Sequence, residues 1–274
     1  MSDSPLPNLR IALNSHSVMV PALTAIKHSA EIITLCSEAI ERADLTRPPP
    51  ITAFMALELS TPVPGISADQ RRFLYLAWLL GKGFHDLARG VRESLEAAAE
   101  YVVVAKYPQG QTTLQHFQAA VTEAKREANK MSFPALMEAV NKNLTSPLSF
   151  NREFLSLQNV RNCLEHRNGI VSEIDLKGDE ALVLATPRFK IFYLRHGEEV
   201  ELGPNCKVVP EEESQTEIQI FLKREIRERR YKLGERVQIS TEEFHEIAAG
   251  CFQFVHDLAS KLPVPTPMEP NAVS

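Results

Sequence analysis

The sequence predicts a mainly α-helical protein, in which a small antiparallel β-meander is inserted before the last helix of a helical bundle. Two observations predict this architecture. Apolar residues recur at helical spacing over several long segments, so each of these segments has one face to bury. After Gly169 the period changes to short alternating segments, and helical spacing returns only at Thr241.

Proline clusters divide the N-terminal part of the chain. Residues 21–43 carry apolar side chains at mostly helical spacing and predict an amphipathic helix. Two clusters then stop any helix, at residues 48–50 and 62–65, and Thr52 to Leu59 between them allows only two helical turns. Residues 1–66 are therefore expected to form a helical N-terminal extension and not an independent domain.

The main domain is expected over residues 67–262. Ser67 and Gln70 have the spacing of a capping box, and the helix that follows keeps one apolar face from Leu74 to Val102. Gly81 and Gly83 are expected to bend it. Further helices are predicted over residues 113–130, after Phe133-Pro134, and over residues 149–166, where Asn168-Gly169 ends the last of them.

The β insertion is expected over residues 170–239. Short apolar or alternating segments lie at residues 181–185, 189–194 and 218–222, and breaks such as His196-Gly197 separate them. A final helix begins at Thr241, with Ser240 or Thr241 as its cap. Residues 263–274 are rich in proline and predict a disordered tail.

Composition narrows the class of protein. Thirty Lys and Arg against 35 Asp and Glu give a net charge of −5, which excludes a generally cationic nucleic-acid binder. No apolar run approaches the roughly 20 residues of a membrane span, and the N-terminus lacks the pattern of a secretory signal. The four cysteines form no C-x-x-C pair, which favours a reducing compartment. We expect a cytoplasmic protein that binds no membrane, metal or other cofactor.

The segment from Leu157 to Gly169 carries the chemistry. At about 100° per residue, Arg161 falls on an apolar stripe of this helix, which is unusual for a permanently charged side chain. Asn162 and His166 are four residues apart and share another face, and His166 lies in the last turn. An arginine can hold a phosphate, and a histidine can move a proton near neutral pH.

A structural interpretation of the same residues is also open. Arg161 can pair with Glu165 one turn further along the helix, and His166 can act as a cation at the helix C-terminus. The spacing alone is weakly specific, because Arg10 and His16 also satisfy it by chance.

The context of these residues resembles the HEPN family, whose motif is an arginine, four to six residues, and a histidine, with a polar residue directly after the arginine. Arg161, Asn162 and His166 match this motif, and the resemblance covers about residues 68–262. It implies a HEPN-like helical bundle that forms a homodimer, and in active members a metal-independent cleavage of RNA. His166 would transfer the proton, Arg161 would hold the phosphate, and Asn162 would orient the substrate or the histidine.

The resemblance also implies partners and an alternative. Toxin members of the family are often encoded beside an antitoxin, so an antitoxin or regulatory protein is a possible partner, in toxin–antitoxin or phage-defence biology. Other members cut nothing, so the alternative function is a non-catalytic interaction or RNA-binding module in which Arg161 and His166 are structural.

A basic segment could contribute to RNA binding. Residues 223–232 hold six basic and two acidic side chains, a local net charge of +4. The functional interpretation is an RNA-backbone patch that includes Arg227, Arg229 and Arg230, with Arg152 and Arg167 extending a basic rim beside the motif helix. The alternative is a solvated strand or short helix with internal Glu–Arg pairs. His85-Asp86 is interpreted as a pair of surface residues, because no nucleophile motif accompanies it.

Overall fold

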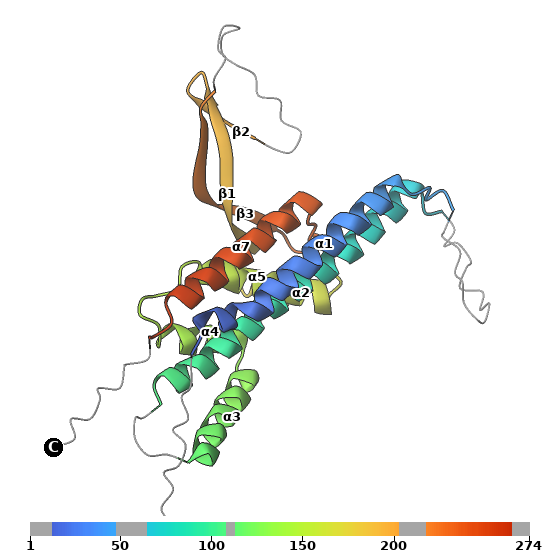
Figure 1. Cartoon of the computed structure of the whole chain (residues 1–274). Coiled ribbons are helices and arrows are strands. Elements are labelled where there is room, and N and C mark those ends of the chain that lie inside the picture. The colour runs from blue at the N-terminus through green and yellow to red at the C-terminus, as the bar shows by residue number, and fades with distance from the viewer. Residues whose placement is uncertain (1–12, 48–64, 108–112, 203–217, 265–274) are drawn as a thin grey trace, which may run out of the picture.

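The computed structural model describes residues 13–47, 65–107, 113–202 and 218–264. It is mainly helical and contains one three-stranded antiparallel sheet, which confirms the predicted class in this general form. Figure 1 shows the sheet standing out from one side of the helical body.

The N-terminal segment forms part of the helical body. A 3₁₀ turn, η1 (Ser15–Met19), leads into helix α1 (Val20–Arg42), which lies beside helix α2 (Ala68–Ala105) in Figure 1. Ser67 caps α2 and forms the predicted capping box with Gln70. Buried residues of η1 and α1, such as Ala22 and Ile33, belong to the same hydrophobic core as α2 and α7 (Thr241–Ser260).

Two of the three glycines of α2, Gly83 and Gly90, serve close packing, whereas the space beside Gly81 is open. The helix runs without interruption through Gly81 and Gly83. A Cβ atom at Gly83 would lie 2.8 Å from Cε2 of Phe244 in α7, and one at Gly90 would lie 2.7 Å from Cβ of Ala25 in α1. Larger side chains at these two positions would push the three helices apart, which offsets the helix-propensity cost of glycine.

The remaining helices complete the body around α2. They are α3 (Leu114–Lys130), α4 (Phe133–Asn141), α5 (Asn151–His166) and the one-turn α6 (Glu173–Leu176). The last helix, α7, starts at the predicted position, where Ser240 and Glu243 form a capping box.

The sheet has the strand order β2-β1-β3, with β1 (Leu182–Arg195), β2 (Glu198–Glu201) and β3 (Ile220–Tyr231). The predicted segments 181–185 and 189–194 form one continuous strand, because Pro187 can be accommodated at an edge. β2 pairs with residues 192–195, so among the described residues the side of β1 opposite β3 has no strand partner at Pro187. Two residues earlier, the N–H of Ala185 donates to Oγ of Ser156 in α5 at 2.9 Å, whereas proline has no N–H to satisfy.

One buried arginine joins the sheet to α7. The Arg188 side chain in β1 is only 7% exposed, and it pairs with Glu201 of β2, Glu225 of β3 and, at 3.2 Å, Glu246 of α7. We call these four residues the Arg188 cluster. The hydrogen bonds that Arg188 donates to Glu201 and Glu225 raise the pKa of the arginine despite its burial, so it stays charged.

Some predictions fall outside the described residues, namely the short segment 52–59 and most of the proline-rich tail. Among the residues that the structure describes, one segment, Ser15–Arg42, has the length and apolar content of a membrane span. A single such segment is weak support for a span, because core helices and signal sequences pass the same test; 28% of the apolar window is buried inside the fold.

Candidate functional site

The motif helix α5 is anchored through one buried line of side chains. Phe154, Leu157, Val160 and Cys163 are buried, and the Phe154 ring stacks on Phe254 of α7 with ring centroids 4.0 Å apart. The line passes through Cys163, so Arg161 lies beside it instead of at its centre. The Arg161 side chain is 24% exposed. Arg161, Asn162, Glu165 and His166 therefore remain partly open to solvent on a rigid helix.

The end of α5 has the predicted form. The N–H groups of Arg167 and Gly169 both donate to the carbonyl of Cys163 at 3.1 Å, and Gly169 has a φ of 75°. Glycine adopts this left-handed conformation at low cost, and asparagine, which precedes it here with a φ of 52°, tolerates it better than most residues. The turn fixes His166 as the last residue of the helix, where cations are favoured.

Two of the three predicted catalytic residues are in direct contact. Nη1 of Arg161 donates to Oδ1 of Asn162 at 3.1 Å, and the Gln158 amide donates to the same oxygen at 3.1 Å. Arg161 also forms an ion pair with Glu165 one turn along the helix. This is the pair that the structural interpretation of the motif anticipates.

Glu165 has neighbours from two helices. Its Oε2 atom lies 3.6 Å from Nδ1 of His85 in α2 and 3.9 Å from Nε2 of His166. With Arg161, three side chains that can carry positive charge surround one carboxylate. We call Glu165, Arg161, His85 and His166 the Glu165 cluster. No local pattern in the sequence indicates His85, because only the packing of α2 against α5 brings it here.

Arg167 faces a different partner. Its guanidinium binds the carboxylate of Asp175 through two hydrogen bonds, one of them from Nε to Oδ2 at 2.7 Å, and the Asp175 side chain is 1% exposed. Burial alone would raise the pKa of Asp175, but hydrogen bonds from Arg167 and Ser172 hold it below its ordinary value. Burial likewise raises the pKa of the adjacent Cys163 thiol to about 11. These groups tie the end of α5 to α6, so the Arg167 guanidinium is already occupied.

The basic segment 223–232 lies mostly in strand β3, and three of its four arginines are paired with glutamates, while Arg224 lies over the ring of Phe189. Arg227 lies 2.8 Å from Glu246 and Arg229 donates to Glu243 at 2.6 Å, both in α7. Glu228 lies between the other two predicted RNA-binding residues, at 3.1 Å from Arg230 and 3.7 Å from Arg152. Of these pairs, Arg230–Glu228 lies within the segment, and the others join β3 to α5 and α7.

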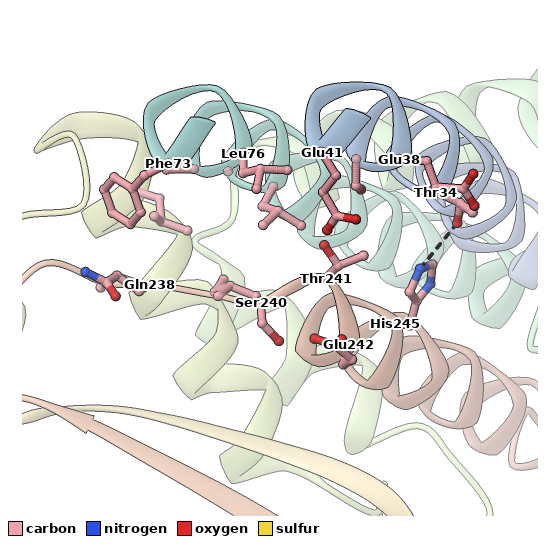
Figure 2. A pocket seen from close by; sticks show the side chains of 17 residues that line it. Thr34, Glu38, Glu41, Phe73, Leu76, Gln238, Ser240, Thr241, Glu242 and His245 are labelled. Carbon is pink, nitrogen blue, oxygen red and sulfur yellow. Dashed lines mark hydrogen bonds between the residues drawn. The ribbon is translucent and has the colours of Figure 1, made fainter. Parts of the chain in front are cut away.

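A cavity at one end of α1 has an acidic rim. Figure 2 shows that it lies between α1, α2 and the start of α7, and its volume is about 460 Å³. Phe73 and Leu76 line its apolar side, while Glu38, Glu41 and Glu242 stand around it. Neither Arg161 nor His166 lines it, and its carboxylates would repel an RNA backbone.

His166 is a surface residue in the protomer. Its side chain is 59% exposed.

Within the described ranges, no group of three or more His, Cys, Asp or Glu residues is arranged to hold a metal ion.

Comparison with family models, with curated proteins and with solved structures finds no match to this chain.

Proposed function

We propose that the protein is a HEPN-like, metal-independent endoribonuclease whose catalytic residues are Arg161, Asn162 and His166. The observation that carries the proposal is the Glu165 cluster, where an arginine and two histidines meet one carboxylate at a partly exposed helix end. A place that gathers positive charge around one anion suits a phosphodiester.

The residues fit cleavage by the 2′-hydroxyl of RNA. That oxygen attacks the adjacent phosphorus while the bond from phosphorus to the 5′ oxygen breaks, which gives a 2′,3′-cyclic phosphate and a free 5′-hydroxyl. Arg161 would neutralise the developing charge on the phosphorane through two parallel hydrogen bonds. His166 would accept the 2′-hydroxyl proton or protonate the leaving oxygen. The hydrogen bond between Asn162 and Arg161 would hold the guanidinium in place.

A homodimer would complete this arrangement. One His166 can serve as base or as acid, and a second copy of the chain would supply another His166 for the opposite role. The exposure of His166 leaves it accessible to such a partner. Placement in toxin–antitoxin or phage-defence biology, with an antitoxin or regulatory protein as a further partner, rests on the family resemblance alone.

The alternative is a non-catalytic interaction or RNA-binding module. A specific observation favours it: Arg161 is paired with Glu165 inside the protomer, and His166 does not line the described cavity. In this case the cluster would only stabilise the end of α5.

RNA degradation by purified variants separates the two functions. We expect His166→Ala and Arg161→Ala each to lose at least about 100-fold in cleavage rate, the usual size of a general acid–base contribution. His256→Ala is the matched control, because His256 is exposed on α7 and belongs to no cluster described above. End-group analysis should find the cyclic phosphate. Undiminished cleavage by His166→Ala would rule out the proposed catalytic role.

A further inference from the structure

The position of Glu165 indicates where an anion binds. Its carboxylate is approached from two helices, by His85 of α2 and by Arg161 and His166 of α5. In the protomer, one carboxylate thus lies among three groups that can each donate a hydrogen bond to an anion. The other histidines of the described residues take no part in this cluster.

Helix stability does not explain this carboxylate. Glu165 lies next to the last residue of α5, where the exposed carbonyl groups make the helix end electronegative and disfavour a negative charge. It also stands C-terminal to its arginine, which is the weaker order for a pair four residues apart. These features make Glu165 easy to displace.

The neighbouring Arg167 shows what a permanent pair looks like on the same helix. Asp175 is buried, binds Arg167 through two hydrogen bonds and accepts a third from the N–H of Ser172 at 2.9 Å. The Glu165 side chain is 36% exposed, and its contacts in the described part of the chain are ion pairs with the side chains of Arg161, His85 and His166. An incoming anion could replace Glu165 but could not replace Asp175.

A phosphodiester is the anion that the site fits. It carries one negative charge, as a carboxylate does, and its two free oxygens match the two parallel N–H groups of a guanidinium. Tetrahedral phosphate oxygens also point in more directions than planar carboxylate oxygens, so donors from two helices can reach the same group.

From this geometry we propose that Glu165 occupies the phosphate subsite of the free protein, and that His85 is a further phosphate-binding residue of that subsite. A phosphate group of the RNA would displace the Glu165 carboxylate and bind Arg161 and His85 in its place. This inference rests on the proposed function, since it assigns a ligand to the same site, but it concerns binding and not cleavage.

The test measures binding of an RNA that cannot be cut. A fluorescent oligonucleotide with 2′-O-methyl groups lacks the nucleophile, and its affinity is read by fluorescence anisotropy at one fixed salt concentration. We expect Glu165→Gln to bind about three- to tenfold more tightly, because a competing charge is removed. We expect His85→Gln to bind about two- to fivefold more weakly, because a phosphate contact is lost.

Glu93→Gln is the matched control. Glu93 follows Arg89 by four residues, as Glu165 follows Arg161, and the Arg89 and Glu93 side chains lie 3.9 Å apart on α2. The substitution removes the same charge without touching the Glu165 cluster. It should leave the affinity unchanged.

Three results would overturn the inference: unchanged or weaker binding by Glu165→Gln, unchanged binding by His85→Gln, or equal tightening by Glu93→Gln. Competition by a polyglutamate peptide as effective as that by RNA would also overturn it, because the site would then prefer carboxylates. Failure of the proposed function has a separate sign. If the binding results hold while unmodified RNA stays intact with the wild type and with Glu165→Gln, the phosphate subsite stands and the nuclease does not.

Discussion

Two ionic clusters in this protein have opposite compositions. In the Arg188 cluster a buried arginine faces three carboxylates, contributed by two strands and a helix. In the Glu165 cluster a partly exposed carboxylate faces an arginine and two histidines. In the first arrangement the buried arginine has three carboxylate partners inside the fold, and Arg227 also pairs with Glu201 and Glu246. In the second arrangement one partly exposed carboxylate is shared by three side chains that can carry positive charge. The number of partners and their burial, more than the presence of an ion pair, separate a structural cluster from a candidate ligand site.

The two clusters also indicate that Arg161 of α5 is a better candidate for binding phosphate than the arginines of β3. Strand β3 holds the densest positive charge in the sequence, yet glutamates of the sheet and of α7 pair with three of its four arginines. Helix α5 is far less basic, but its Arg161 shares one carboxylate with two histidines. Local charge density is thus a poorer guide to a phosphate site than the balance of partners around each cation.

Removal of the buried arginine should have the largest effect on stability. Arg188→Met leaves three carboxylates facing each other between the sheet and α7 and should cost about 3–4 kcal/mol in the free energy of unfolding. Urea denaturation measures this loss. Arg126→Met, which removes an exposed arginine from α3, is the control and should change stability by about 0.5 kcal/mol or less. A loss for Arg188→Met no larger than that of the control would show that the cluster is not structural.

Breaking the Arg167–Asp175 pair should cause the second-largest loss in the free energy of unfolding, and this loss should depend on pH. Asp175→Asn leaves the guanidinium without its charged partner and should cost about 2 kcal/mol at pH 7. Because the pKa of Asp175 is lowered in the folded state, its stabilisation is complete above its unfolded pKa of about 3.9 and is lost as pH falls through the lower folded value. The difference between wild type and variant should stay constant from pH 8 to 5 and shrink only below about pH 4.

Urea titrations at several pH values test this expectation, with the Arg188→Met variant measured in parallel. A difference that disappears between pH 8 and 6 would contradict it, because Asp175 remains ionised throughout that range.

Much of the fold could be predicted because local signals govern it. The caps at Ser67 and Ser240 and the glycine turn after His166 are set by residues within a few positions of each helix end, and all three occur as predicted. The continuity of β1 could not be predicted, because Pro187 is tolerated only where no second strand pairs with it. The need for glycine at position 83 likewise comes from the close approach of α1 and α7, and the sequence around Gly83 gives no sign of it.

The candidate site could be predicted only in part for the same reason. Arg161, Asn162 and His166 lie on one helix, so their spacing in the sequence is enough to bring them together. His85 lies in α2, and nothing near it in the sequence indicates that its ring reaches Glu165. The pairing of Arg167 with Asp175 could not be predicted from the sequence either, because Asp175 becomes buried only when α6 folds against the end of α5.

The smallest effect on stability is expected at the candidate site itself. Arg161→Gln removes the guanidinium from a partly exposed pair four residues apart on a helix, and such pairs contribute about 1 kcal/mol or less. In urea denaturation, the free energy of unfolding of this variant should therefore lie within about 1 kcal/mol of the wild-type value. It should lie well above the free energy of unfolding of Arg188→Met. If Arg161→Gln instead costs as much as Arg188→Met, Arg161 belongs to the framework of the fold, and the non-catalytic alternative gains. A small loss, together with the expected loss of RNA cleavage by the alanine variants, would mean that the fold keeps Arg161 available for a ligand.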